Sequence, residues 1–499
     1  MKEIGSHSPS NKKMKKWRPV DTYDNYVTPN KVNYQDTLNA MLNTRLQAPL
    51  MDNSESMLLS LDNNSGVFFG MRPSEIYPYY IGKEENADGH FLGLGGTGSG
   101  KTKCLLFNIL RSWHSPLIAF DLKGDMVEQW HRINESKPVH LRKKLKVINP
   151  SLNDACSYDP YEFLLSDGED NLYQNANSLA MALLPLDINT KDPIWRQSCQ
   201  MLLTGCILYF LRKGFGFIKT MTAVQMTDAR RLLTLISQSD NKMAKLAVSQ
   251  FNNLEDKVLL NLSLDLNALA IFATDPMIMN SLSPSSARDT VNWRDFNSND
   301  SPYDVIIQID EAKLDAWSPY TQLLINQLLR SLSTRPDKYA TSSTNGKTAP
   351  LLLLLDEFPG LGYIPRIKLA LSTLLSRRVT IGIFIQSMAQ LDDIYGENVR
   401  QIIMDNCDYK LLLSARDYKT QANLSALTGV VKTGLRSITH NLRTPDDFSI
   451  STSEAYEPII LPHEFSTLED IVLDSPYGVC RIDKIFYKSD RLLPLQNYE

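Results

Sequence analysis

The sequence predicts an α/β protein with a mostly parallel sheet that is interrupted by an all-helical segment. Short apolar runs alternate with helix-like stretches, and a glycine-rich loop joins one such run to a helix. At 499 residues the chain is long enough for two to four domains. We expect a polar N-terminal tail over residues 1–60, α/β parts over 61–167 and 301–499, and the all-α domain over 168–300.

Seven apolar runs are the predicted strands of the sheet. Each run has the length of a strand, and parallel strands are apolar throughout because helices cover both faces of the sheet. The predicted strands are residues 91–94, 116–120, 145–148, 304–309, 351–355, 381–385 and 410–413.

Helical periodicity supports the interruption of the sheet domain. Apolar residues recur on one face of a predicted helix that ends before Gly214. These residues are Cys199, Leu202, Leu203, Cys206, Ile207, Phe210 and Leu211. Another amphipathic helix is predicted over 319–332, where the α/β pattern has resumed.

The overall composition excludes several classes of protein. A net charge of −4 excludes nucleic-acid binding over the whole surface, so any such contact must be a local patch or a channel lining. The six cysteines are scattered and form no C-x-x-C pair, which is typical of buried thiols in a reducing compartment. No stretch reaches the roughly 18 apolar residues needed to span a bilayer, and we find no signal peptide. We therefore expect a cytoplasmic protein.

Two basic clusters each have two interpretations. The first either contacts an anionic membrane or nucleic acid, or belongs to a solvated tail. The second either lines a pore that holds DNA, or forms a solvated basic face. The first comprises Lys12, Lys13, Lys15, Lys16 and Arg18, and the second comprises Arg142, Lys143, Lys144 and Lys146.

The glycine-rich loop predicts a nucleoside triphosphate site. Residues 95–102 read Gly-Gly-Thr-Gly-Ser-Gly-Lys-Thr, a complete match to G-x-x-x-x-G-K-[ST] between a predicted strand and a helix. Such a loop directs backbone N–H groups at phosphate oxygens. Lys101 would bridge the β- and γ-phosphates, and the Thr102 hydroxyl would bind Mg²⁺. The other predicted nucleotide-binding residues of the loop are Gly95, Gly96, Thr97, Gly98, Ser99 and Gly100.

A second motif predicts the hydrolytic half of the same site. Asp356 and Glu357 follow five leucines, in the pattern of a Walker B strand. Asp356 would hold Mg²⁺, and Glu357 would activate the attacking water, which is a poor nucleophile without a positioned base. Gln386, at the end of another predicted strand, either senses the γ-phosphate or orients the attacking water, or it is a polar residue that marks the strand end.

Several charged residues near these motifs remain open. Arg377 and Arg378 are either arginine fingers that reach a neighbouring subunit's nucleotide or a surface pair, and Arg416 is a third finger candidate. Asp121 and Lys123 either support the nucleotide site or belong to an ordinary turn after a strand.

In order along the chain, these motifs resemble the type IV coupling proteins, the TraG/TraD-like ATPases of bacterial conjugation and type IV secretion. The combination of Asp-Glu-Phe-Pro with the later Gln-Ser is more specific than the glycine-rich loop. The matching segments are residues 96–102, 120–125, 354–362, 385–391, 394–396 and 458–465, and the resemblance covers roughly residues 60–499.

The resemblance implies a RecA/FtsK-like P-loop domain interrupted by an all-α domain that contacts substrate complexes. It implies ATP and Mg²⁺ as cofactors and a homo-hexameric ring when active, while the isolated chain is either a ring or a monomer. The partners would be DNA with its relaxase, or protein effectors, and the components of a type IV secretion channel. The site of action would be the cytoplasmic face of the bacterial inner membrane.

Many members of this family begin with transmembrane helices, for which we find no counterpart in this sequence. Either a membrane adaptor replaces the anchor or the anchor has been trimmed. Two other functions remain open. One is a HerA/FtsK-like DNA translocase outside secretion, and the other is a nucleotide-gated adaptor with negligible hydrolysis.

Overall fold

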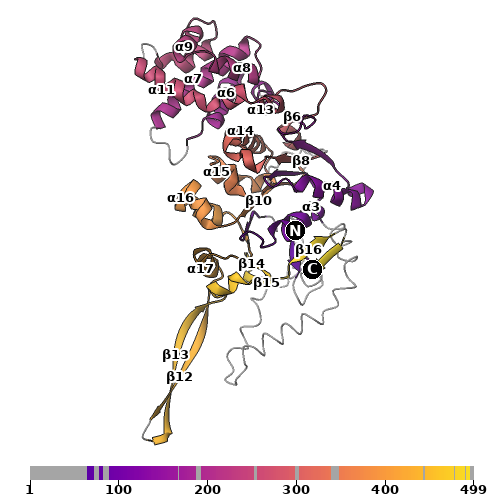
Figure 1. Cartoon of the computed structure of the whole chain (residues 1–499), viewed down its shortest axis with the longest axis vertical. Coiled ribbons are helices and arrows are strands. Elements are labelled where there is room, and N and C mark those ends of the chain that lie inside the picture. Colours follow the sequence, from indigo (N-terminus) through magenta and orange to yellow (C-terminus); the bar gives the residue numbers. More distant parts are fainter. Residues whose placement is uncertain are drawn as a thin grey trace, which may run out of the picture.

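The structure is a computed structural model. It describes residues 65–71, 78–81, 89–166, 168–186, 193–251, 255–297, 303–338, 348–441, 444–476, 478–488 and 491–494. Figure 1 shows a helical region at one end, a sheet with its covering helices in the middle, and a two-stranded ribbon at the other end. The predicted N-terminal tail and its basic cluster lie outside the described residues.

A nine-stranded sheet runs through the centre of the described chain. Seven neighbouring strands are parallel, and the two further strands at one edge are added through antiparallel pairings. The order is β15 (Gly478–Ile482), β14 (Ile471–Ser475), β11 (Tyr409–Leu412), β3 (Phe91–Leu94), β10 (Val379–Ile385), β9 (Leu351–Leu355), β4 (Leu117–Asp121), β8 (Tyr303–Gln308) and β5 (Lys144–Ile148). The predicted fold class is confirmed, and each of the seven predicted strands lies within two residues of its predicted limits.

Each face of the sheet has its own hydrophobic core, because successive side chains of a strand point to opposite faces. Leu354 belongs to one core and Leu353 to the other, and both are fully buried. The helices over the Leu354 face are α3 (Phe107–Ser112) and α4 (Met126–Ser136). Those over the Leu353 face are α14 (Leu314–Leu332), α15 (Ile367–Thr373) and α16 (Met388–Asp405).

The helical region lies between two very short strands, β6 (Ser157–Tyr158) and β7 (Thr290–Val291), which pair in parallel. Its helices are α5 (Glu162–Ser166), α6 (Leu172–Leu183), α7 (Pro193–Arg212), α8 (Phe217–Gln225), α9 (Ala229–Ser237), α10 (Lys242–Val248), α11 (Asp256–Leu266), α12 (Ile271–Thr274) and α13 (Pro276–Ser281). The predicted helical face at 199–211 lies within α7. The exact domain limits remain a prediction. In the part of the chain that the structure describes, no helix combines the length and the apolar character needed to cross a membrane.

Polar contacts join the helical region to α14. The indole N–H of Trp317 donates to Asp275 Oδ2 over 2.9 Å, and the hydroxyls of Tyr320 and Ser281 are 2.8 Å apart. Both aromatic side chains are buried, so the two contacts satisfy polar groups that would otherwise lack partners. Helix α14 therefore belongs to the packing of the sheet and of the helical region at once.

The sequence analysis missed a long antiparallel ribbon of β12 (Val430–Asn441) and β13 (Thr444–Pro458). It projects from the body of the protein (Figure 1). Helix α17 (Tyr418–Leu427) leads into the ribbon, and the N–H of Ile459 donates to the Gly429 carbonyl at its root. Two further hairpins, β1 (Val67–Met71) with β2 (Pro78–Ile81) and β16 (Ile485–Lys488) with β17 (Arg491–Pro494), were also not predicted.

Three of the four basic residues at 142–146 bind oxygens of the chain itself. Lys143 Nζ lies 2.8 Å from Asp304 Oδ1. Lys146 and Arg142 each donate to backbone carbonyls, over 2.7 and 2.9 Å. Of the four residues, Arg142 and Lys144 are exposed. A pore lining built from these side chains therefore gains no support from the structure.

Asp304, near the start of β8, connects four elements of the sheet domain. Its carboxylate is buried and accepts hydrogen bonds from the Leu117 N–H over 2.9 Å and from the Trp130 indole over 2.8 Å, besides the ion pair with Lys143. It thus joins β8 to β4, α4 and the start of β5. Lys143 also donates to the carbonyls of Ser115 and Trp113, over 2.8 and 3.3 Å. Removal of the carboxylate would therefore leave the Leu117 and Trp130 N–H groups unsatisfied and a partly buried cation without its counter-ion.

We predict that Asp304→Ala destabilises the protein by about 3–5 kcal/mol, since it removes one partner of a buried ion pair. A lowered urea midpoint, followed by circular dichroism, would measure the effect. The matched control is Lys144→Ala, a change at an exposed position of the neighbouring strand, which should cost no more than about 0.5 kcal/mol. Equal midpoints for Asp304→Ala and the wild type would contradict the assigned role of this carboxylate.

Candidate functional site

The glycine-rich loop leaves β3 and enters a helix at Lys101. The first turns of this helix have π geometry, over Lys101–Leu106, and continue as α3. Gly98 and Gly100 have φ angles of 78° and 97°, which a residue with a side chain rarely adopts. A Cβ atom on Gly98 would meet nothing within 4 Å, so the outer side of the loop is open. Such a tight, open loop before a helix N-terminus is suited to an anion.

Lys101 turns back into the loop. Its ammonium donates to the carbonyl of Gly95 and, over 3.1 Å, to the carbonyl of Ile385 at the end of β10. Burial lowers the pKa of Lys101 to about 8, although the charges of Glu357 and Asp356 oppose this shift. The lysine is thus a buried cation with only backbone oxygens as hydrogen-bond acceptors in the described chain.

The ends of two neighbouring strands enclose the loop. On one side, Thr97 Oγ1 donates to Gln386 Oε1 over 3.1 Å, directly after β10. On the other side, the Gly96 N–H donates to the Ser414 carbonyl over 2.9 Å, after β11. The structure therefore brings the predicted residue Gln386 to the loop. The contribution of Ser414 was missed, because a backbone carbonyl leaves no signal in the sequence.

The two remaining hydroxyl residues of the loop have different environments. Ser99 is buried, and its Oγ has no hydrogen-bond partner among the described residues. Thr102 lies half-buried in the first helical turn, next to Lys101. The predicted roles of Ser99 in nucleotide binding and of Thr102 in Mg²⁺ binding stay predictions.

The acidic pair lies at the end of β9, which is separated from β3 by β10 alone. Asp356 is fully buried, and Glu357 has a left-handed backbone with φ 53° and ψ 53°. None of the four carboxylate oxygens accepts a hydrogen bond within the described residues. Burial raises the pKa of Asp356 to about 6, which the cation of Lys123 opposes and the charge of Glu357 reinforces.

The lysine and the acidic pair meet at one edge of the sheet. Both motifs follow the carboxyl ends of parallel strands, and the charges of Asp356 and Glu357 are close enough to act on the pKa of Lys101. Ligands bind at this edge in open α/β sheets. The strand order thus brings Lys101 and Asp356 to the same edge of the sheet, although they are more than 250 positions apart in the sequence.

Lys123 joins this group, whereas Asp121 shapes the turn that presents it. Lys123 Nζ lies 3.7 Å from Asp356 Oδ2 and 3.9 Å from Glu357 Oε2. The buried carboxylate of Asp121 accepts N–H groups of its own turn, including that of Gly124 over 2.8 Å, and the amide of Gln308 over 2.9 Å. Both carboxylate oxygens of Asp121 already accept hydrogen bonds from the protein. A direct contact of Asp121 with nucleotide therefore stays a prediction that the structure does not support.

The predicted arginine fingers lie elsewhere. Arg377 and Arg378 precede β10, at the opposite end of the strand from Gln386, and Arg377 donates to the carbonyl of Arg335. Within one chain they do not meet Lys101, so a role at a nucleotide would require a second subunit. Arg416 is exposed in the loop after β11, close to the glycine-rich loop. The identity of a finger remains open between these residues.

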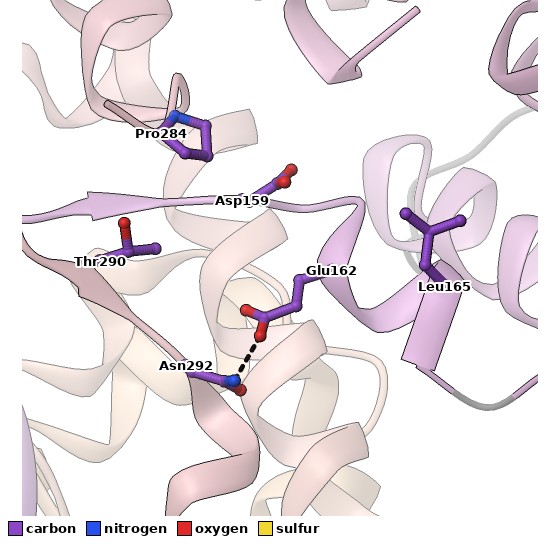
Figure 2. Close-up of a pocket in the computed structure, with 6 residues that line it drawn as sticks. All are labelled: Asp159, Glu162, Leu165, Pro284, Thr290 and Asn292. Atoms are coloured by element: carbon purple, nitrogen blue, oxygen red, sulfur yellow. Dashed lines mark hydrogen bonds between the residues drawn. The ribbon is translucent and has the colours of Figure 1, made fainter. Parts of the chain in front are cut away.

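A separate cavity of about 550 Å³ lies beside the β6–β7 pair (Figure 2). In Figure 2 the carboxylate of Glu162 points toward the amide of Asn292, with which it forms a hydrogen bond. The cavity is lined by Asp159, Glu162, Leu165, Pro284, Thr290 and Asn292. None of the predicted site residues lines it, so it belongs to the junction with the helical region.

Comparison with known protein families gives one match over most of the chain. The profile described as type IV secretory system conjugative DNA transfer matches residues 51–497. Among curated proteins, VirD4 of Rhizobium rhizogenes is 23% identical over 416 residues, which cover 81% of this chain and 59% of VirD4. The conjugal transfer protein TraG of Escherichia coli is 23% identical over 429 residues, covering 79% of this chain and 66% of TraG.

Solved structures of the plasmid coupling protein TrwB share the fold. The unbound form of TrwB without its first 70 residues has a TM-score of 0.63 at 16% identity, covering 80% of this chain and 85% of that one. TrwB in complex with the ATP analogue ADPNP has a TM-score of 0.61 at 15% identity, and covers 80% of this chain and 86% of that one. TrwB with ADP and Mg²⁺ has a TM-score of 0.60 at 16% identity, with coverages of 80% and 85%.

We predict that Asp356 makes the ligand-free protein less stable as the pH rises from about 4 to about 6. In this window the folded state binds more protons than the unfolded chain, because burial raises the pKa of Asp356 from 3.8 to about 6. The loss in free energy of unfolding is at most about 3 kcal/mol. Urea midpoints between pH 4 and 7 would measure it, and Asp356→Asn should reduce the slope. An unchanged slope would contradict the assigned burial.

Proposed function

This chain belongs to the type IV secretory system conjugative DNA transfer family, and we propose that it is an ATP-driven coupling protein. In this proposal it recruits DNA with its bound relaxase, or protein effectors, to a type IV secretion channel and powers their transfer. The observation that carries the proposal is that the loop of Lys101 and the pair Asp356–Glu357 follow the two strands on either side of β10, at the same edge of the sheet.

The glycine-rich loop would bind the triphosphate of ATP. Lys101 donates only to backbone carbonyls in the described chain, and phosphate oxygens are stronger acceptors for an ammonium group. Thr102 and Asp356 would hold Mg²⁺, which would neutralise phosphate charge when bound. The donor set fits this ion, since both oxygens of Asp356 are buried without a hydrogen-bond donor in the described residues. TrwB, which shares the fold, has been solved with ADPNP and with ADP and Mg²⁺.

Glu357 would orient the attacking water and accept its proton at a carboxylate oxygen. Its backbone is left-handed directly after β9, and neither of its buried carboxylate oxygens accepts a hydrogen bond in the described chain. Gln386 would report the γ-phosphate to the loop, because it already contacts Thr97. Lys123 balances the charge of the acidic pair. These roles together describe a P-loop ATPase.

The assembly and its partners are part of the proposal. The matched region covers 59% of VirD4, so the substrates and partners of such whole proteins do not transfer directly. We propose a homo-hexamer in which Arg377, Arg378 or Arg416 of one subunit reaches the nucleotide of the next. The ring would act at the cytoplasmic face of the inner membrane, held there by a membrane adaptor or by an anchor that precedes the family domain.

We predict that Glu357→Gln lowers the rate of ATP hydrolysis at least 100-fold while ATP still binds, because the variant lacks the base but keeps the shape of the side chain. Lys101→Ala should instead weaken ATP binding. Phosphate release and the fluorescence of a labelled ATP analogue measure the two effects. Glu311→Gln, at an exposed position, is the matched control. Hydrolysis at the wild-type rate by Glu357→Gln would favour the nucleotide-gated adaptor.

We predict that the same two variants abolish substrate transfer in the native host, since a motor without hydrolysis cannot move its cargo. Transfer frequency between donor and recipient cells measures this effect. Glu357→Gln should also retain cargo, so that a pull-down yields a relaxase or channel components. Transfer at the normal frequency by either variant would rule out the motor. Recovery of DNA without any secretion component would favour a HerA/FtsK-like translocase.

A further inference from the structure

The proposed base sits at the start of a tight turn that needs support. Glu357 has φ 53° and ψ 53°, and such a backbone costs a residue with a side chain about 1–3 kcal/mol. The 3₁₀ turn Phe358–Leu361 follows directly, and the Gly360 N–H closes it by donating to the Glu357 carbonyl over 2.8 Å. A strained conformation of this kind persists only where the surrounding structure fixes it.

Tyr395 of α16 holds this turn at two places. Its ring stacks on Phe358 with centroids 5.4 Å apart and ring planes 8° from parallel. Its hydroxyl accepts the Ile364 N–H over 3.1 Å and donates to the Gly362 carbonyl over 3.0 Å. One buried side chain thus contacts both the residue after Glu357 and the backbone beyond the turn.

The opposite side of the turn is closed as well. A Cβ atom on Gly360 would lie 2.7 Å from Leu122, the residue before Lys123, and one on Gly362 would lie 2.9 Å from Gln322 of α14. The turn is therefore packed between α14, the β4 loop and α16. A change on the α16 side cannot be absorbed by movement toward the other two.

Helix α16 also begins at the site. Its N-cap is Ser387, next to Gln386, and the Ser387 N–H donates to Gln390 Oε1 over 3.2 Å in a capping box. The helical geometry breaks at Gly396, with φ 75° and ψ 161°, directly after Tyr395. The segment between Gln386 and Tyr395 is thus a capped unit of about two turns, roughly 12 Å long. It connects the proposed phosphate sensor to the turn of the proposed base.

We propose that Tyr395 is a positioning residue for Glu357, which it keeps in the orientation needed for hydrolysis. This inference rests on the proposed function. In the described chain, the hydrogen bonds and ring contacts of Tyr395 lie at Phe358 and at residues 362–364, away from the glycine-rich loop and beyond the acidic pair. It acts through Phe358 and the backbone of the turn, so nucleotide binding should not depend on it. Its loss should slow the chemical step, because a misplacement of about 1 Å at a reacting group costs up to about 100-fold in rate.

The test is a kinetic comparison of two variants. Tyr395→Phe keeps the ring stack and removes both hydrogen bonds, and we expect kcat to fall about 10-fold with KM for ATP unchanged within twofold. Tyr395→Leu also removes the stack, and kcat should fall about 100-fold. Thermal unfolding checks that each variant is folded, and Tyr395→Phe carries the test alone if Tyr395→Leu is not. Tyr363→Phe is the matched control, because this neighbouring ring packs against Tyr395 at 5.3 Å.

A double-mutant cycle separates positioning from general packing. In the Glu357→Gln background, Tyr395→Phe should cause no further loss of the residual rate, since the group it positions is already absent. A loss that persists in that background, or a Tyr395→Phe variant with wild-type kcat, would overturn the inference while Glu357→Gln still upholds the proposed function. A wild-type chain without ATPase activity would overturn both.

Discussion

The burial of three charged side chains at one edge of the parallel sheet is the constraint on which this structure depends. Lys101, Asp356 and Glu357 are drawn from water at a cost that the attraction of Lys101 and Lys123 for the two carboxylates offsets in part. The sheet order makes this grouping possible, since β10 separates β3 from β9 and its last carbonyl receives the lysine. Backbone hydrogen bonds fix the segments that carry these charges. The Gly96 N–H donates to the Ser414 carbonyl in the loop, and the Gly360 N–H donates to the Glu357 carbonyl in the turn after the acidic pair.

Helix α14 contacts both the turn after the acidic pair and the helical region. Its first half packs against the turn after the acidic pair, at Leu314 and Gln322, and carries the aromatic contacts to Asp275 and Ser281 of the helical region. The path of packed groups from the carboxylates to these helices is therefore short and continuous. In the proposed coupling protein, where a nucleotide cycle would act on bound cargo, such shared packing would give the two parts a physical link. It also explains why the helical region can be inserted into the chain without isolating it from the sheet.

Much of the sheet and of the site was predictable because apolar runs and a glycine-rich loop carry strong local signals. The five leucines of β9 predict a strand that is buried on both faces, and the spacing of glycines up to Lys101 predicts a phosphate-binding loop. Other features depend on tertiary contacts that no local pattern records. Ser414 acts through a carbonyl, and Tyr395 resembles any buried aromatic until its hydroxyl is seen on the turn. The β12–β13 ribbon was missed because its sequence is rich in serine and threonine, which are as common in loops as in strands.

The ribbon converts small rotations into large displacements. Twelve paired rows at the usual strand rise extend about 40 Å, so that a tilt of 5° at the base carries the tip through about 3–4 Å. Its base is tied close to the glycine-rich loop, because Ser425 of α17 donates to the Ile460 carbonyl and the Ala415 N–H donates to the Phe465 carbonyl. A ribbon of two strands is flexible, since it encloses no hydrophobic core. The ribbon therefore bends more readily than the nine-stranded sheet from which it extends.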